Sequence, residues 1–204
     1  PVNPRSLRDE GMREARRLLM GERHMQPLAD YVADLRTRFD GEIPDFDPLD
    51  GGIDASILFL FEKPGPMTSN NRSGRAGSGF ISRDNDDGTA ENIFRFMSEA
   101  EIPRRETILW NLIPWWDGQV KFAGSDKTRA LLELSNFVDI LTALRTVVLV
   151  GKTAQKATPF FAERGLLTVN SYHPSPKVRA INRPLWNSIP GVWRQAALRT
   201  LAAD

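Results

Sequence analysis

Four short apolar runs recur along this chain, separated by longer segments with a different pattern. They cover residues 56–61, 107–113, 146–150 and 166–171. Each run is nearly uninterrupted, which is typical of a strand that is buried on both faces of a parallel sheet. The segments between the runs carry apolar residues at helical spacing. This alternation predicts a parallel sheet with helices on both faces.

The helical spacing defines the remaining elements. We expect two helices in the first 40 residues, and further helices over residues 90–100, 127–143 and 152–162. A last helix is expected from near Pro190 to about Leu201. Residues 41–54 are rich in Asp, Pro and Gly, as in a linker. The sequence therefore predicts an N-terminal helical extension over residues 1–50 and one compact α/β unit over residues 51–204.

The composition excludes several kinds of site. The chain has 204 residues, 41% of them hydrophobic, which suits a globular protein with a sizeable core. It has no cysteine, so disulfides, cysteine-bound zinc and iron–sulfur clusters are excluded. No apolar run approaches the ~20 residues of a membrane span, and no signal-peptide pattern opens the sequence. On these grounds we expect a cytoplasmic protein without a membrane partner.

Charge is distributed unevenly between the two halves. Residues 1–100 carry 13 Lys and Arg against 18 Asp and Glu, whereas residues 101–204 carry 14 against 8. A basic half can attract phosphates. Uneven charge is also common on the surface of soluble proteins, so a fold is needed to locate these charges.

Polar residues follow the predicted strands at their carboxyl ends. The first strand ends in Glu62-Lys63, the second contains Asn111, and the fourth runs on to His173. Open α/β sheets bind ligands at this edge, so these side chains could converge on one small ligand. Each residue also has a purely structural interpretation. Glu62 and Lys63 could form a solvated ion pair, and Asn111 could hydrogen-bond to a loop carbonyl. His173 could lie in a turn stiffened by the two prolines.

A long loop over residues 69–80 separates the first strand from the next helix. It combines small residues with two arginines and one aromatic residue. Such a loop can form a flexible rim that approaches a flat anionic ligand closely. Loops longer than about 12–15 residues in compact domains are usually functional or disordered.

Taken in chain order, these residues resemble the uracil-DNA glycosylase superfamily. Phe61-Glu62-Lys63-Pro64-Gly65 is similar to its first motif, in the Gly-Glu-Ala-Pro-Gly form, and Gly74-Arg75-Ala76-Gly77 resembles the glycine-rich stretch that follows. Asn111 resembles the uracil-reading asparagine, and His173-Pro174-Ser175-Pro176 matches the second motif. The resemblance covers about residues 54–204. It implies a three-layer αβα sandwich on a four-stranded parallel sheet.

The activity implied by the resemblance is hydrolysis of the N-glycosidic bond of uracil, or of a related deaminated base, flipped out of DNA. His173 would donate to O2 of the base and stabilise the leaving anion, while Glu62 would position water. Asn111 would read the base edge and Phe80 would stack on its face. The remaining implied contacts are Lys63, Pro64 and Gly65 for substrate, and Arg72, Arg75, Ser175, Lys177, Arg179 and Arg183 for DNA.

The resemblance further implies a monomer that acts in base-excision repair without metal or cofactor. Three departures leave other activities open. Lys63 replaces the Asp, Asn or Ala of the family, the cluster-binding cysteines of the Gly-Glu-Ala-Pro-Gly branch are absent, and Lys177 stands where an apolar wedge is common. In addition, Arg72 lies nearer than Phe80 to the usual place of the stacking residue.

Two alternative activities remain open. Lys63 could act as an amine nucleophile of a lyase. The chain could also be a non-catalytic homologue that binds damaged or single-stranded DNA.

Overall fold

The computed structural model of the chain describes residues 3–69, 77–119 and 124–202. Its central sheet has four parallel strands in the order β4-β2-β5-β6. The strands are β2 (Ile57–Phe61), β4 (Thr107–Asn111), β5 (Thr146–Val150) and β6 (Leu167–Ser171). Each lies within the apolar run that predicted it. The predicted α/β fold with a four-stranded parallel sheet is confirmed.

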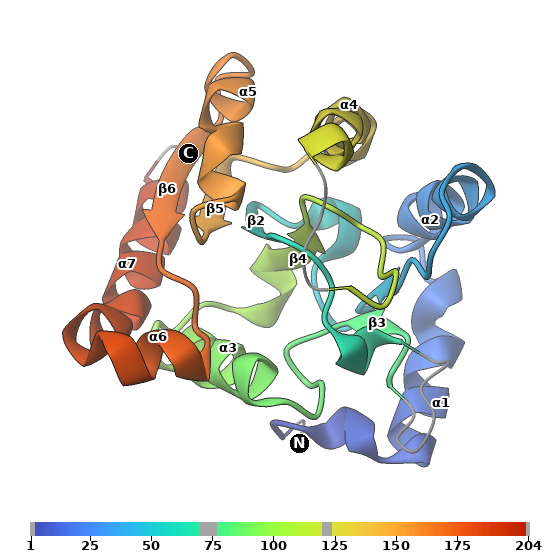
Figure 1. The fold of residues 1–204 in the computed structure, drawn as a ribbon, viewed down its shortest axis with the longest axis horizontal. Helices are drawn as coiled ribbons and strands as arrows, with labels where there is room; N and C mark the ends of the chain where they lie inside the picture. Colours follow the sequence, from blue (N-terminus) through green and yellow to red (C-terminus); the bar gives the residue numbers. More distant parts are fainter. Residues whose placement is uncertain (1–2, 70–76, 120–123, 203–204) are drawn as a thin grey trace.

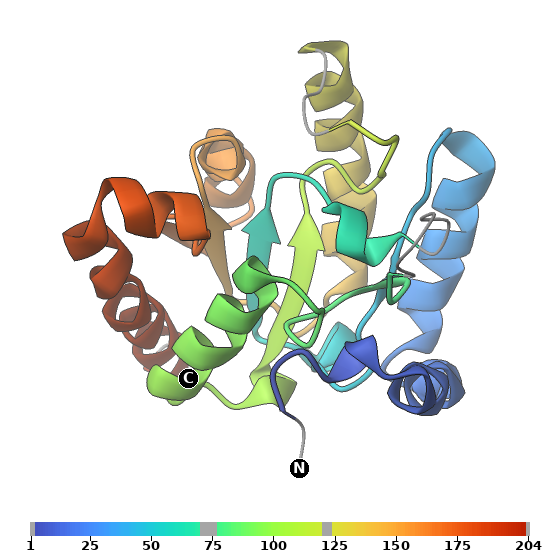
Figure 2. The same ribbon diagram turned by 60° about the horizontal axis from the view of Figure 1, so that its bottom comes forward.

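Helices cover both faces of this sheet (Figures 1 and 2). One face carries α3 (Gly88–Glu99) and α7 (Arg183–Leu201), and the other carries α2 (Gln26–Arg38) and α4 (Gly124–Ile140). Side chains alternate between the faces of a strand. Phe59 of β2 accordingly meets Trp193 of α7, with ring centroids 4.9 Å apart, whereas Trp110 of β4 lies 5.7 Å from Phe137 of α4.

The N-terminal segment packs onto the same structure. Apart from α2 it contains α1 (Glu10–Leu18) and the short strand β1 (Asp45–Phe46), which pairs in parallel with β3 (Phe80–Ile81). Leu28, Val32 and Leu35 of α2 are fully buried in the main hydrophobic core. Residues 1–50 therefore share a core with the rest of the chain, and a separate extension ending at residue 50 stays a prediction.

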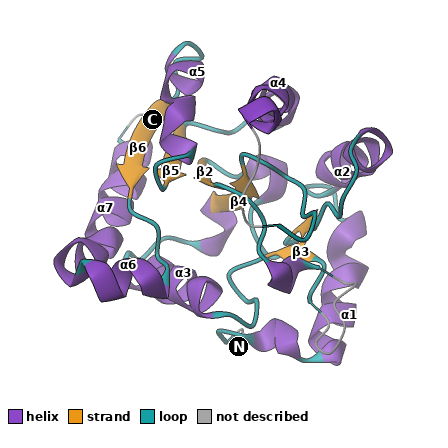
Figure 3. Cartoon of the chain, in the orientation of Figure 1, coloured by secondary structure: helices purple, strands orange, loops and turns teal. Residues whose placement is uncertain are grey.

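The C-terminal helix begins earlier than the sequence predicted. This helix, labelled α7 in Figure 3, starts at Arg183. Pro190 lies inside it rather than at its beginning. The side chain of Asn182 accepts a hydrogen bond from the backbone N–H of Leu185 at 3.2 Å, and Pro184 fits the first turn. These are N-terminal helix signals, and they outweigh the loss of one backbone hydrogen bond at the inner proline.

Two shorter helices flank the last strand. The segment expected to be one helix over residues 152–162 is a 3₁₀ turn (Ala154–Ala157) followed by α5 (Thr158–Ala162). After β6 an unpredicted helix, α6 (Pro176–Ile181), begins within the His-Pro-Ser-Pro sequence. The hydroxyl of Ser175 accepts from the backbone N–H of Val178 at 3.3 Å and so caps it. The second motif thus leads directly into a helix.

Candidate functional site

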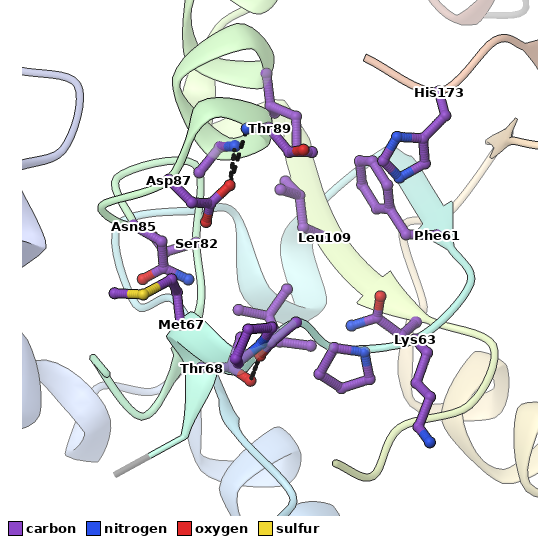
Figure 4. Close-up of a pocket in the computed structure, with 17 residues that line it drawn as sticks. Phe61, Lys63, Met67, Thr68, Ser82, Asn85, Asp87, Thr89, Leu109 and His173 are labelled. Carbon is purple, nitrogen blue, oxygen red and sulfur yellow. Dashed lines mark hydrogen bonds between the residues drawn. The ribbon is translucent and has the colours of Figure 1, made fainter. Parts of the chain in front are cut away.

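A cavity of about 310 Å³ opens at the carboxyl end of the sheet, beside the beginning of α3 (Figure 4). Asn111 and His173 both line it, together with Phe61. Phe61 and Asn111 are paired residues of β2 and β4. Because strand side chains alternate, they point to the same face as Phe59 and Leu109, which is the face covered by α3. The strand register therefore brings these side chains to one cavity.

Asn111 is the most deeply buried polar group at this end of β4. It is only 5% exposed, and its carboxamide makes no hydrogen bond with the residues that the structure describes. Buried polar groups in proteins are nearly always hydrogen-bonded. A buried carboxamide that faces a cavity without a partner is suited to a ligand that offers both a donor and an acceptor.

Hydrogen bonds on both sides hold the loop that carries His173. The hydroxyl of Ser171 accepts from the indole N–H of Trp193 at 2.8 Å, and its backbone carbonyl accepts from the amide of Gln155 at 3.1 Å. On the other side, the carbonyl of Pro174 accepts from the side-chain amide of Asn92, in α3, at 2.9 Å. The backbone on either side of His173 is thus anchored to β6 and to α3.

The His173 ring meets the ring of Phe61 edge-on, with centroids 5.9 Å apart and an interplanar angle of 80°. Burial lowers the pKa of His173 below its ordinary 6.5, although the nearby carboxylate of Glu62 acts in the opposite direction. The lowered pKa favours the neutral ring at pH 7. A neutral imidazole has one N–H donor and one acceptor, and neither is used by the described residues around it.

Glu62 lies in an adjacent hollow rather than in the cavity with Asn111. This second hollow, of about 300 Å³, is lined by Glu62, Trp116 and His173, and it shares residues 63–66 with the first. His173 borders both spaces. The three predicted residues therefore meet around His173, with Asn111 on one side of it and Glu62 on the other.

Lys63 lines both spaces, but its ammonium group is directed elsewhere. It donates to a carboxylate oxygen of Asp117 at 2.7 Å and to the backbone carbonyl of Gln119 at 2.9 Å. Figure 4 shows the side chain pointing away from His173. Pro64 and Gly65, the next two residues predicted to bind substrate, also line the cavity.

Phe80, predicted to stack on the base, lies outside the cavity. It is 2% exposed and belongs to β3, where it pairs with Asp45 while its neighbour Ile81 lines the cavity. The pairing of β3 with β1 fixes this orientation. Phe61 is the phenylalanine that lines the cavity among the described residues. Phe61 is the first residue of the first motif, but the sequence alone assigned it no role.

The predicted DNA contacts have different surroundings. Arg72 and Arg75 lie outside the described residues. Ser175 caps α6, and the exposed Lys177 lines a groove of about 710 Å³ that runs on from His173. The guanidinium of Arg179 lies 5.2 Å from the ring centroid of Trp186. Arg183 is exposed at the beginning of α7.

The sequence did not predict the wall of the cavity that lies opposite His173. Figure 4 shows Ser82, Asn85 and Asp87 there. Asp87 caps α3, because one carboxylate oxygen accepts from the backbone N–H groups of Thr89 and Ala90, each at 2.9 Å. An Asp directly before a helical segment is an N-cap signal that could have located this wall.

A buried network of charges supports this wall from behind. Arg16 of α1 and Arg104 both bind Asp84 at 2.9 Å, and both also contact Asp47. The hydroxyl of Ser82 donates to Asp47. The network therefore joins the N-terminal helix to a residue of the cavity.

Asp50 extends this network. It accepts from Nε of Arg104 at 2.8 Å. Burial raises the pKa of Asp50 to about 6, against the lowering effect of Arg83 and Arg104.

Among the described residues, no group of His, Asp and Glu is placed to hold a metal ion. No helix in the described ranges has both the length and the apolar character needed to cross a bilayer.

No family model matches this sequence, and no curated protein matches it. Among solved structures, the fold is similar to the wild-type UNG crystal structure from Nitratifractor salsuginis. The two chains are 14% identical, with a TM-score of 0.46, and the match covers 93% of this chain and 98% of the other. So remote a likeness assigns no activity, which has to be argued from the residues of this chain.

Proposed function

We propose that the protein is a DNA glycosylase that hydrolyses the N-glycosidic bond of uracil, or of a related deaminated base, after the base has left the helix. One observation carries the proposal. Asn111 and His173 line the same cavity, and neither side chain uses its hydrogen-bonding atoms on a described residue. The motif resemblance noted in the sequence gives these two residues complementary roles on one base.

The proposed reaction uses these groups as follows. The carboxamide of Asn111 would pair with N3–H and O4 of the base, and the N–H of neutral His173 would donate to O2. When the bond between N1 and C1′ breaks, its electrons stay on the base, and the hydrogen bond to O2 stabilises the resulting anion. Water adds to C1′ and loses a proton, first to the carboxylate of Glu62 and finally to the departed base.

The position of Lys63 favours hydrolysis over a lyase mechanism. An amine nucleophile must be unprotonated and free to reach C1′. The ammonium of Lys63 instead donates to Asp117 and to the carbonyl of Gln119. These contacts also hold its positive charge away from the side of the cavity where a cationic sugar would form.

The test is incubation with a DNA oligonucleotide that contains one uracil, with and without borohydride. Release of free uracil without a trapped adduct is the expected result. A trapped protein–DNA adduct would instead assign the reaction to an amine nucleophile, and retarded DNA without released base would indicate a binding protein. The same oligonucleotide with thymine in place of uracil, and the His173→Ala protein, serve as controls.

A further inference from the structure

The wall of the cavity opposite His173 offers few unused polar atoms. Ser82 and Asn85 are already engaged: the first donates to Asp47, and the second accepts from Ser78 and donates to the carbonyl of Phe80 at 2.9 Å. Asp87 differs from both. One of its carboxylate oxygens caps α3, while the other makes no hydrogen bond with a residue that the structure describes.

Asp87 is also the carboxylate that lines this cavity among the described residues. Glu62 lies in the adjacent hollow, and the ammonium of Lys63 is directed towards Asp117. An ionised carboxylate can only accept hydrogen bonds. The hydroxyl of Thr89 lies on the same wall and can adapt as donor or acceptor. The charge of Asp87 therefore decides which ligand groups this wall attracts.

The orientation of a bound base follows from the opposite wall. Under the proposed function, His173 and Asn111 take O2, N3 and O4 of a uracil ring. The edge that remains carries C5 and C6, and it would face the wall of Asp87, which lies opposite His173 (Figure 4). C5 is the position on this edge that can carry a substituent without disturbing the bond to the sugar.

We propose that Asp87 is a specificity-determining residue, which selects uracil-type bases that carry a hydrogen-bond donor on C5. The inference rests on the proposed function and deepens it. A hydroxyl on a C5 substituent donates to the free carboxylate oxygen, whereas a carbonyl on the same substituent is repelled by it. A hydrogen bond to a charged group changes affinity by about 10- to 100-fold.

Three free bases of similar shape separate these cases: 5-hydroxymethyluracil has a donor, thymine has a methyl group, and 5-formyluracil has an acceptor. Their binding can be followed by NMR through the ring signals of His173, one of two histidines in the chain. The His24→Gln protein assigns these signals. We expect affinity to fall from the hydroxymethyl to the methyl to the formyl base, with about tenfold or more between the first two.

Two variants remove the carboxylate while keeping the helix cap, because Asn and Ser are as good at this position as Asp. Asp87→Ser should abolish the preference for the hydroxymethyl over the methyl base. Asp87→Asn presents an N–H to the cavity and should raise affinity for the formyl base above that for thymine. Asp9→Asn is the matched control, since Asp9 caps α1 through Met12 N at 3.0 Å and lies away from the cavity.

Equal affinity of the wild-type protein for the three bases, or an unchanged order in Asp87→Asn, would overturn the role of Asp87. Absence of binding by 5-hydroxymethyluracil at millimolar concentration would do the same. Cleavage of oligonucleotides with the same three bases is measured in parallel. If no oligonucleotide is cut, including one with plain uracil, the proposed function fails, while the affinity order of the free bases still tests Asp87.

Discussion

His173 and Asn111 illustrate how burial prepares a side chain for a ligand. Burial lowers the pKa of His173, and it leaves the carboxamide of Asn111 without a described partner. Because both side chains line the cavity and neither is engaged by a described residue, their polar atoms remain available to a ligand. Lys63 shows the opposite arrangement, since its charge is neutralised outside the cavity.

Loss of the His173 ring should affect the rate far more than binding. If its N–H stabilises the leaving anion, His173→Ala should cleave uracil-containing DNA about 10²–10³-fold more slowly, the range for one oxyanion donor. Affinity for the DNA should change much less, because most of that affinity comes from phosphate contacts. Single-turnover cleavage and DNA titration measure the two separately. His24→Gln is the control, and wild-type cleavage by His173→Ala would remove the ring from the mechanism.

The protonation of His173 provides a second measurement. Because burial is the main cause of its shift, the ring should titrate below pH 6.5 in the folded protein, as followed by NMR. Glu62 favours the protonated ring, so Glu62→Gln should lower the pKa of His173 further. Cleavage that depends on a neutral donor should not decline between pH 7 and pH 9. A midpoint above 6.5, or an upward shift in Glu62→Gln, would contradict this electrostatic description.

Lys63 tests the choice between hydrolysis and lyase chemistry. The ammonium of Lys63 is held by Asp117 and takes no part in the proposed hydrolysis, so we expect Lys63→Asn to retain or increase base release. If Lys63 were the nucleophile, the same change would abolish base release and borohydride trapping together. Lys156→Asn is a matched control, with the same change on an exposed residue that lines neither the cavity nor the groove. Thermal unfolding of both variants shows whether the loss of the Asp117 contact disturbs the fold.

At the scale of elements, the site depends on how α1, α3 and the strands are joined. The buried contacts of Arg16 with Asp47 and Asp84 link α1 to the wall that carries Ser82 and Asp87. A buried charge left without its partner is strongly unfavourable. The N-terminal helix therefore stabilises a part of the cavity to which it contributes no lining residue.

Replacing Arg16 should destabilise the whole domain. Arg16→Ala leaves two buried aspartates with fewer positive partners, and removing one member of a buried ion pair typically costs about 3–5 kcal/mol. Chemical denaturation measures this loss directly. Arg17→Ala, one residue along the same helix, removes only exposed contacts with Glu10 and Glu14 and should leave the unfolding midpoint almost unchanged. A change of less than about 1 kcal/mol in Arg16→Ala would mean that the network relaxes around the loss.

The sequence predicted those elements whose pattern is local. The runs at 146–150 and 107–113 are largely apolar, so a buried strand was the simple interpretation, and both runs contain strands. Pro190 was misleading, because it was interpreted as a helix start although Asn182 provides the cap eight residues earlier in the sequence. Capping depends on one side chain and one backbone N–H, and periodicity does not detect it.

The candidate site was predictable only in part for a related reason. Strand ends located Asn111 and His173, since the carboxyl ends of parallel strands share an edge. The orientation of Phe80 depends on the pairing of β3 with β1, two strands of two residues each that carry no pattern of their own. The inward position of Asp87 depends on where α3 lies against the second motif, which Asn92 fixes through the carbonyl of Pro174. Such long-range contacts are not encoded in local spacing.

At the scale of the whole molecule, the basic half of the chain can be placed. Lys152, Tyr172 and Lys177 line the groove that runs on from His173, and Arg183 begins α7 nearby in the chain. A DNA strand that delivers a base to the cavity would have to pass this carboxyl end of the sheet. Lys152, Lys177 and Arg183, three of the positive charges of the second half, are therefore the candidates for contacts along the proposed DNA path.

This placement predicts how DNA binding depends on salt. Each phosphate neutralised by Lys or Arg releases counterions, which contributes about 0.7–0.9 to the slope of log affinity against log salt concentration. Lys177→Ala and Arg183→Ala should each reduce this slope by roughly one unit, and the double variant by about two. Arg179→Ala should have a smaller effect, because its guanidinium already packs over Trp186.

Arg199→Ala is the control. Arg199 is also exposed, but it lies near the opposite end of the sheet, because the hydroxyl of the next residue, Thr200, donates to Thr146 at the amino end of β5. Unchanged slopes in Lys177→Ala and Arg183→Ala, with a reduced slope in Arg199→Ala, would move the DNA path to the other end of the sheet and away from His173.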